Sequence, residues 1–267
     1  RYNDRGRYLA VDGNGGVYIC GTTYGSEFPV KHGFQSKWAG NRGESYPDVF
    51  LVRVDTKKTW SESLAYSTYL GGMAADQAGG LAVDKKGCAY ITGYTRSNDF
   101  PVRGAFQTHL DWGQDAFVAK IDTNRLEEYS LIYSTFLGGE GSREAGTGIV
   151  VNKTGRVFVT GHTESRGFPV MQPIRDASGG GCLDIFVTEI NGAGNDLLFS
   201  TLLGTGKNCS SKGIGMDAMG FIYIAGNTGN RHFPVRGSAT SRPKGTCRFF
   251  SKLMPPGKPG VNVIPKQ

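Results

Sequence analysis

Three acidic side chains occupy the same place in three repeated segments of this chain, and they are its first candidates for chemistry. Asp4, Asp76 and Glu144 each lie seven residues before a repeated Val, and Cys209 takes that place in the fourth segment. Carboxylates that surround one opening could bind a cation or a basic group, or could serve as the acid and base of a hydrolase. The alternative interpretation is that each carboxylate accepts hydrogen bonds from backbone amides of a turn.

A second set of candidates varies between a Gly and a Thr that all four repeats keep. The varying positions are Thr22, Tyr94, His162 and Asn227. Because the flanking residues stay the same while these change, we expect the four side chains to contact a ligand rather than to maintain the fold.

Motifs for nucleophilic catalysis or zinc binding are absent from the sequence. There is no GxSxG or HExxH, and the four histidines occupy different places in the repeats. Asp12 and Asn14 begin like a calcium loop, but the corresponding Asp84 is followed by two lysines. We therefore predict an Asx turn there, no metal site, no cofactor and no catalytic residue. The alternative is a carbohydrate hydrolase or lyase that uses Asp76 and Glu144.

The elements that position these residues come from an internal repeat. A block of the type DAFVAKID follows each first segment and begins at residues 48, 115, 184 and, in degenerate form, 247. A block of the type YSTFLGG follows only the first three and begins at residues 66, 133 and 199. The first segments themselves align without a gap at 11–30, 83–102, 151–170 and 216–235.

Each repeat is predicted to form four short antiparallel strands. Alternating β-branched and aromatic residues follow a Gly- and Asn-rich turn, and no stretch has helical periodicity. Four-stranded units of this length are typical of β-propeller blades, with the Gly-rich strand innermost. We predict one all-β propeller domain over 1–267, with repeats at approximately 4–72, 73–139, 140–205 and 206–254 and a tail at 255–267.

The blocks LAVD, AYITGYT, DFPV, DAFVAKID and YSTFLGG stand in order in the second repeat. With them the chain resembles the bacterial beta-propeller repeat family called SBBP. The resemblance implies a propeller, usually in exported or cell-surface proteins, and implies little about activity. The family name suggests seven blades, whereas this chain holds four repeats.

The four predicted blades can be arranged in two ways. One is a closed four-bladed ring, which the sequence favours and in which the tail at 260–265 supplies a missing strand. The other is an arc of a larger ring, completed by further subunits. Phe28, Phe100, Phe168 and Phe233 begin the repeated Phe-Pro-Val, and we expect these rings to pack between neighbouring blades.

The loops after the second strand of each blade are the longest, and they lie on one face in an up-and-down blade. Such a face is where a propeller would bind a partner. We therefore predict a non-enzymatic scaffold or binding module that contacts a protein or glycan through this face. The net charge of +7 comes from scattered basic residues, so no nucleic-acid partner is expected. No apolar run approaches 18 residues, so no membrane span is expected.

Five cysteines leave at least one without a partner inside the chain. Cys182 precedes the third strand of the third repeat and Cys209 follows its fourth strand, so we predict a disulfide between them, with Cys247 as the rival partner of Cys209. An extracellular or cell-surface location would follow. The alternative is that all five are thiols in a reducing compartment.

Overall fold

A computed structural model describes residues 3–40, 46–140, 143–174, 183–203, 209–229 and 247–253. The described chain is almost entirely β, with two short 3-10 helices, η1 (Trp60–Glu62) and η2 (Glu127–Tyr129). The predicted all-β fold class is confirmed.

Four antiparallel sheets follow one another along the chain, and in each the strands pair in sequence order. The first sheet contains β1 (Arg5–Val11), β2 (Gly16–Thr23), β3 (Asp48–Asp55) and β4 (Leu64–Leu70). The second contains β5 (Asp76–Val83), β6 (Cys88–Thr95), β7 (Asp115–Asp122) and β8 (Leu131–Leu137). The third contains β9 (Ala145–Val151), β10 (Val157–Thr163), β11 (Asp184–Ile190) and β12 (Leu197–Leu203). The described part of the fourth contains β13 (Ser210–Met216), β14 (Ile222–Thr228) and β15 (Cys247–Leu253).

The turn between the first two strands of each sheet is built by one side chain. Asp84 Oδ1 accepts hydrogen bonds from the amides of Lys86 and Cys88 at 2.8 and 3.0 Å, and Gly87 takes a φ of 83°. Asp12, Asn152 and Asp217 make the same pair of bonds. The predicted Asx turn is therefore confirmed in all four repeats.

Consecutive sheets pack face to face, and the cores lie between them. One cluster joins the first and second sheets and includes Phe100, and the next joins the second and third and includes Phe168. Phe100 also lies 4.8 Å from the Phe117 ring of its own sheet. For these two rings the prediction of packing between blades is confirmed, whereas Phe233 lies outside the described residues.

The first strands of the sheets form the inner layer of the molecule. β1 contacts β5, β5 contacts β9, and β9 contacts β13. Glycine allows the approach, since a Cβ on Gly79 would lie 1.9 Å from the carbonyl oxygen of Gly146. The prediction that the Gly-rich strand is innermost agrees with these contacts.

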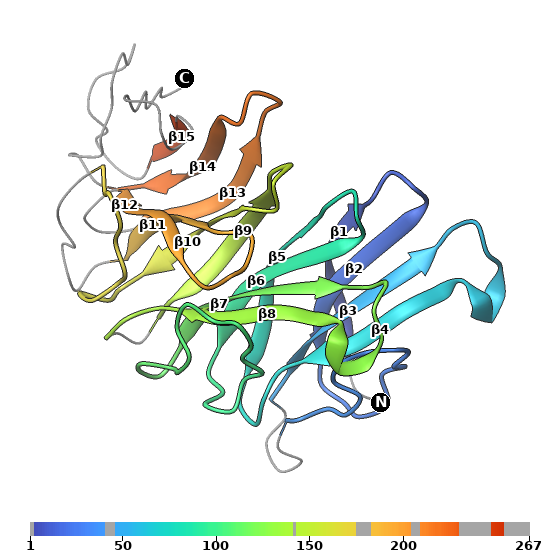
Figure 1. Ribbon diagram of the computed structural model, residues 1–267. Helices are drawn as coiled ribbons and strands as arrows, with labels where there is room; N and C mark the ends of the chain where they lie inside the picture. Colours follow the sequence, from blue (N-terminus) through green and yellow to red (C-terminus); the bar gives the residue numbers. More distant parts are fainter. Residues whose placement is uncertain are drawn as a thin grey trace.

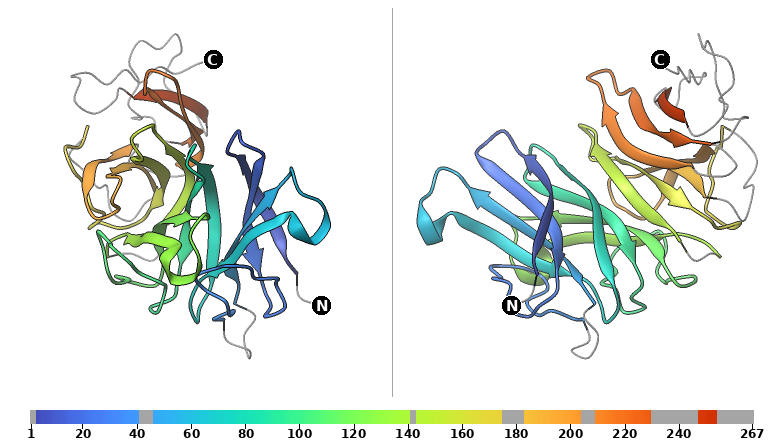
Figure 2. Two further views of the ribbon diagram at one scale, coloured as in Figure 1. Left: turned by 45° about the vertical axis from the view of Figure 1, so that its right-hand side comes forward. Right: turned by 180° about the vertical axis from the view of Figure 1, so that it is seen from behind.

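The described sheets do not close into a ring. They form a curved row in which the first sheet and the fourth lie at opposite ends (Figure 1), and the view from behind shows the same open arc (Figure 2). The substantial contacts between described sheets join only consecutive ones. The favoured closed four-bladed ring is therefore not what the described residues form; they form the arc.

The long segment after the second strand folds back over the outermost strand of its own sheet. Backbone hydrogen bonds join Arg103 with Ser134 of β8, and Lys31 with Ser67 of β4. The Ser67 and Ser200 hydroxyls donate further bonds of 2.6 Å to the carbonyls of Pro29 and Pro169. Each of these segments thus covers an edge that would otherwise be open to another strand, and only part of it is left on the face where it begins.

Candidate binding site on the long-looped face

The face that the segments after β2, β6 and β10 share with the turns between sheets is called the long-looped face below. In Figure 1 it lies along the lower side of the first two sheets. The turn at 71–75 connects β4 to β5, and the Arg96 amide donates to the Ala75 carbonyl at 3.0 Å. The two kinds of loop are therefore joined directly.

The repeated carboxylates stand at this face, but the structure does not gather them around one opening. Asp76 is fully buried, and its Oδ2 accepts hydrogen bonds from Gly72 N at 2.8 Å and Ser97 Oγ at 2.9 Å. Glu144 is also fully buried, and its Oε1 accepts a 2.8 Å bond from Thr163 Oγ1. Asp4 is exposed. The bond from the Gly72 amide matches the alternative interpretation for Asp76, whereas the bond to Glu144 comes from a side-chain hydroxyl of β10.

Two acidic residues that sequence reasoning left without a role lie beside them. Asp48 begins β3 and is fully buried, and its Oδ2 accepts a 2.9 Å bond from Ala39 N. A Cβ on Gly71 would lie 2.8 Å from both Asp48 Oδ1 and Asp76 Oδ2, so this glycine lets the backbone pass between two carboxylates. In the next sheet Asp115 takes the place of Asp48, with Gln107 Nε2 donating to it at 2.9 Å. The signal was the repeated Asp that begins each DxF block.

Burial raises the pKa of these carboxyl groups. It raises the pKa of Asp48 to about 8, and the neighbouring Asp76 adds to the rise. It raises the pKa of Asp76 to about 7, although the hydrogen bonds that this carboxylate accepts lower the pKa. Burial also raises the pKa of Glu144 to about 7, with a contribution from Asp115, whose own pKa rises to about 6. The nearby carboxylate thus opposes ionisation of Asp48 and of Glu144.

The varying positions between Gly and Thr lie one on each second strand and do not meet as a cluster. Thr22 is buried, whereas Tyr94, His162 and Asn227 are half-buried. Burial raises the pKa of Tyr94, with Arg96 and Arg7 opposing it, and burial lowers the pKa of His162. The Tyr94 ring lies 6.0 Å from the Arg96 guanidinium carbon.

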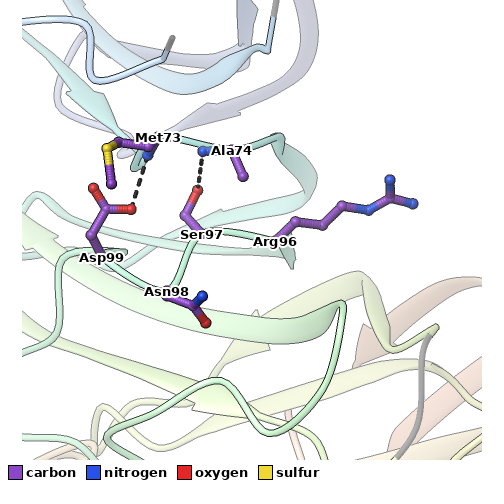
Figure 3. A pocket seen from close by; sticks show the side chains of 6 residues that line it. All are labelled: Met73, Ala74, Arg96, Ser97, Asn98 and Asp99. Atoms are coloured by element: carbon purple, nitrogen blue, oxygen red, sulfur yellow. Dashed lines mark hydrogen bonds between the residues drawn. The ribbon is translucent and has the colours of Figure 1, made fainter. Parts of the chain in front are cut away.

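A cavity of about 300 Å³ lies where the turn at 71–75 meets the segment after β6. Two bonds hold these segments together, Ala74 N to Ser97 Oγ at 3.0 Å and Met73 N to Asp99 Oδ1 at 2.9 Å (Figure 3). The cavity is lined by Met73, Ala74, Arg96, Ser97, Asn98 and Asp99. Sequence reasoning missed these residues; the only signal was that their residue types vary between the repeats, beside Asp76 and Thr95.

The cavity presents groups of several kinds to solvent. Arg96, Asn98 and Asp99 are exposed, and Met73 is 63% exposed. The Arg96 side chain extends away from the two bonded segments (Figure 3), and its Nε donates to Gln114 Oε1 at 3.1 Å. Within the described part of the chain this guanidinium forms no ion pair, so it remains available to a ligand.

Residues 1–29 and 65–101 match the family model of the SBBP beta-propeller repeat. The resemblance to this family is therefore confirmed over these two stretches. All of the cavity-lining residues fall within the second SBBP match. The comparison with curated proteins found no match.

Two further predictions concern a disulfide and a membrane span. Cys182 lies outside the described residues, so the Cys182–Cys209 disulfide stays a prediction; Cys209 is buried, with its Sγ 3.3 Å from Thr228 Oγ1. Among the described residues, no helix is long and apolar enough to cross a bilayer.

Proposed function

We propose that this SBBP-repeat chain is a binding module that contacts a protein or glycan partner through its long-looped face, with the cavity at Arg96 as the centre of contact. The observation that carries the proposal is the cavity itself, where a guanidinium, an amide and a carboxylate are exposed together. Convergent polar groups around a concavity are the usual features of a binding site.

The residues that hold the cavity together support this role because they are buried and hydrogen-bonded to one another. Ser97 is 1% exposed and links the Ala74 amide to the Asp76 carboxylate, which is 0% exposed. A site whose backbone is already held loses little conformational entropy when a ligand binds. The exposed side chains therefore stand on a rigid support.

The chemistry of the lining favours a polar ligand. Arg96 and Asn98 can donate hydrogen bonds, and Asn98 and Asp99 can accept them. Hydroxyl groups of a sugar or the backbone of a peptide would satisfy such a set, while Met73 offers apolar contact. We place the module outside the cytoplasm, as the SBBP resemblance implies.

The alternative function, a carbohydrate hydrolase or lyase with Asp76 and Glu144 as its acid and base, gains no support from their positions. Both residues are 0% exposed. A catalytic carboxyl group has to reach the bond that it protonates or attacks, and neither group reaches the surface of the described chain.

The test compares the long-looped face with the opposite end of the second sheet, where the turn between β5 and β6 lies. The labelled chain is applied to arrayed glycans and to a set of surface polypeptides, and the dissociation constant is measured for whatever binds. The Arg96→Ala/Asn98→Ala variant should weaken binding at least about tenfold, and the Tyr94→Ala/His162→Ala variant should weaken it as well, with melting temperatures within a few degrees of the original. The Lys85→Ala/Lys86→Ala control changes two exposed residues of the opposite turn and should bind normally. Loss of binding in the control alone would overturn the proposal.

A further inference from the structure

The first sheet leaves apolar side chains uncovered on its inner strand. Leu9 and Val11 of β1 are 68% and 61% exposed. The residue that corresponds to Leu9 in the third sheet, Ile149, is only 5% exposed because the second sheet packs against it. Phe28 shows the same difference, since it is half-buried whereas its counterpart Phe100 is 3% exposed. This side of the first sheet therefore has the composition of an interface without its partner.

The fourth sheet has the opposite surface at the other end of the arc. Gly213 and Gly215 lie inside β13 with negative φ, and no described atom lies within 4 Å of a Cβ added to either. At the places equivalent to Gly213, a Cβ on Gly80 would lie 3.0 Å from Gly148 Cα, and one on Gly148 would lie 2.9 Å from Ile214 Cγ2. Glycine inside a strand is less stable than alanine and marks a site of close backbone approach.

These two surfaces are the two halves of one junction. Between the third and fourth sheets the Ile214 side chain lies over Gly148. Leu9 occupies in β1 the repeat position that Ile214 occupies in β13, and Gly213 occupies the position of Gly148. A large apolar side chain is thus exposed at one end of the arc, and the glycine that would receive it is open at the other end.

We propose that a second copy of this chain docks head to tail, with Leu9 and Val11 of one copy against Gly213 and Gly215 of the next. The contact continues an arrangement that the chain already uses between its own sheets. Because the two patches differ, the association is heterologous, and it closes into a ring when the rotation between copies permits. The proposal does not depend on the function of the long-looped face.

Sedimentation velocity over a wide range of concentrations tests the association. The original chain should show a concentration-dependent oligomer. Leu9→Asp should raise the dissociation constant more than about tenfold. Gly213→Leu should do the same with an unchanged melting temperature, because the added side chain projects into space that no described atom of its own chain fills. Trp60→Asp is the matched control, since Trp60 is a 93% exposed apolar residue of η1, which connects β3 to β4 and does not belong to β1 or β13.

A cross-link defines the geometry of the contact. The Leu9→Cys and Gly213→Cys variants should form a disulfide-linked dimer when they are mixed and oxidised, and neither variant alone should exceed the unmodified chain. A monomer at every concentration, an oligomer that Leu9→Asp and Gly213→Leu leave intact, or equal cross-linking in the separate samples would each overturn the proposal.

Discussion

The Ser97 hydroxyl donates a 2.9 Å hydrogen bond to the buried carboxylate of Asp76, and this bond joins the segment after β6 to the start of β5. The same hydroxyl oxygen accepts a 3.0 Å bond from Ala74 N. One side chain thus connects the inner strand, the turn between two sheets and the cavity of the long-looped face.

Replacement of this hydroxyl should lower stability and loosen the cavity together. Ser97→Ala removes one partner of a buried carboxylate, which costs about 1–3 kcal/mol of unfolding free energy. Urea denaturation measures the loss, and hydrogen exchange of the Ala74 amide measures the local effect. Thr154→Ala, at an exposed turn position, is the control and should change stability by less than about 1 kcal/mol. Equal losses in both variants would show that the Ser97–Asp76 bond has no special role.

The buried acids predict an unusual dependence of stability on pH. Carboxyl groups ionise near pH 4 in an unfolded chain, whereas the pKa values of Asp48, Asp76, Asp115 and Glu144 in the folded protein are about 8, 7, 6 and 7. Between these values the folded state binds more protons than the unfolded state. The stability that these groups contribute is therefore complete below about pH 4 and is lost as the pH rises through 6 to 8.

Urea denaturation at pH 5 and pH 8 checks this expectation. The unfolding free energy should be lower at pH 8 by more than about 1.4 kcal/mol, the equivalent of one pKa unit. Asp48→Asn should reduce the difference because the amide keeps the shape of the carboxyl group without its titration. A stability that increases from pH 5 to pH 8 would contradict the prediction.

The repeated Phe predicts a contrast between two otherwise equivalent positions. Phe100→Ala removes a ring that is 3% exposed and should cost about 3–5 kcal/mol. Phe28→Ala removes a half-buried ring at the open end of the arc and should cost clearly less. Denaturation at low protein concentration, where association is minimal, measures both. Equal costs would mean that the open end is covered even in the monomer.

The cysteines test the proposed location. We expect a non-reduced digest of the exported protein to contain a Cys182–Cys209 peptide, and the closed loop should stabilise the fold by about 3–4 kcal/mol. Cys20 and Cys88 are buried free thiols, so they should react with an alkylating reagent only after unfolding. Five alkylatable thiols in the unfolded, unreduced protein would instead place the chain in a reducing compartment.

The repeat, the four-stranded units and the turns were all predictable from the sequence, because each depends on residues close together in the chain. Asp84 builds its turn with amides two and four residues away. The β-branched and aromatic residues likewise indicated the strands β6 and β7, in which almost every residue is buried. Burial of Phe100 followed from its recurrence beside a Pro.

Only the tertiary structure decided what the acidic residues do and how the arc ends. Asp76 and Glu144 are buried within turns because residues distant in the chain cover them, and Asp48 comes from another sheet to lie against the same glycine as Asp76. Spacing along one strand cannot report such a neighbour. Curvature between sheets also depends on the summed volumes of the side chains in each interface, so the repeat alone could not determine whether Leu9 would be covered by Gly213 of its own chain.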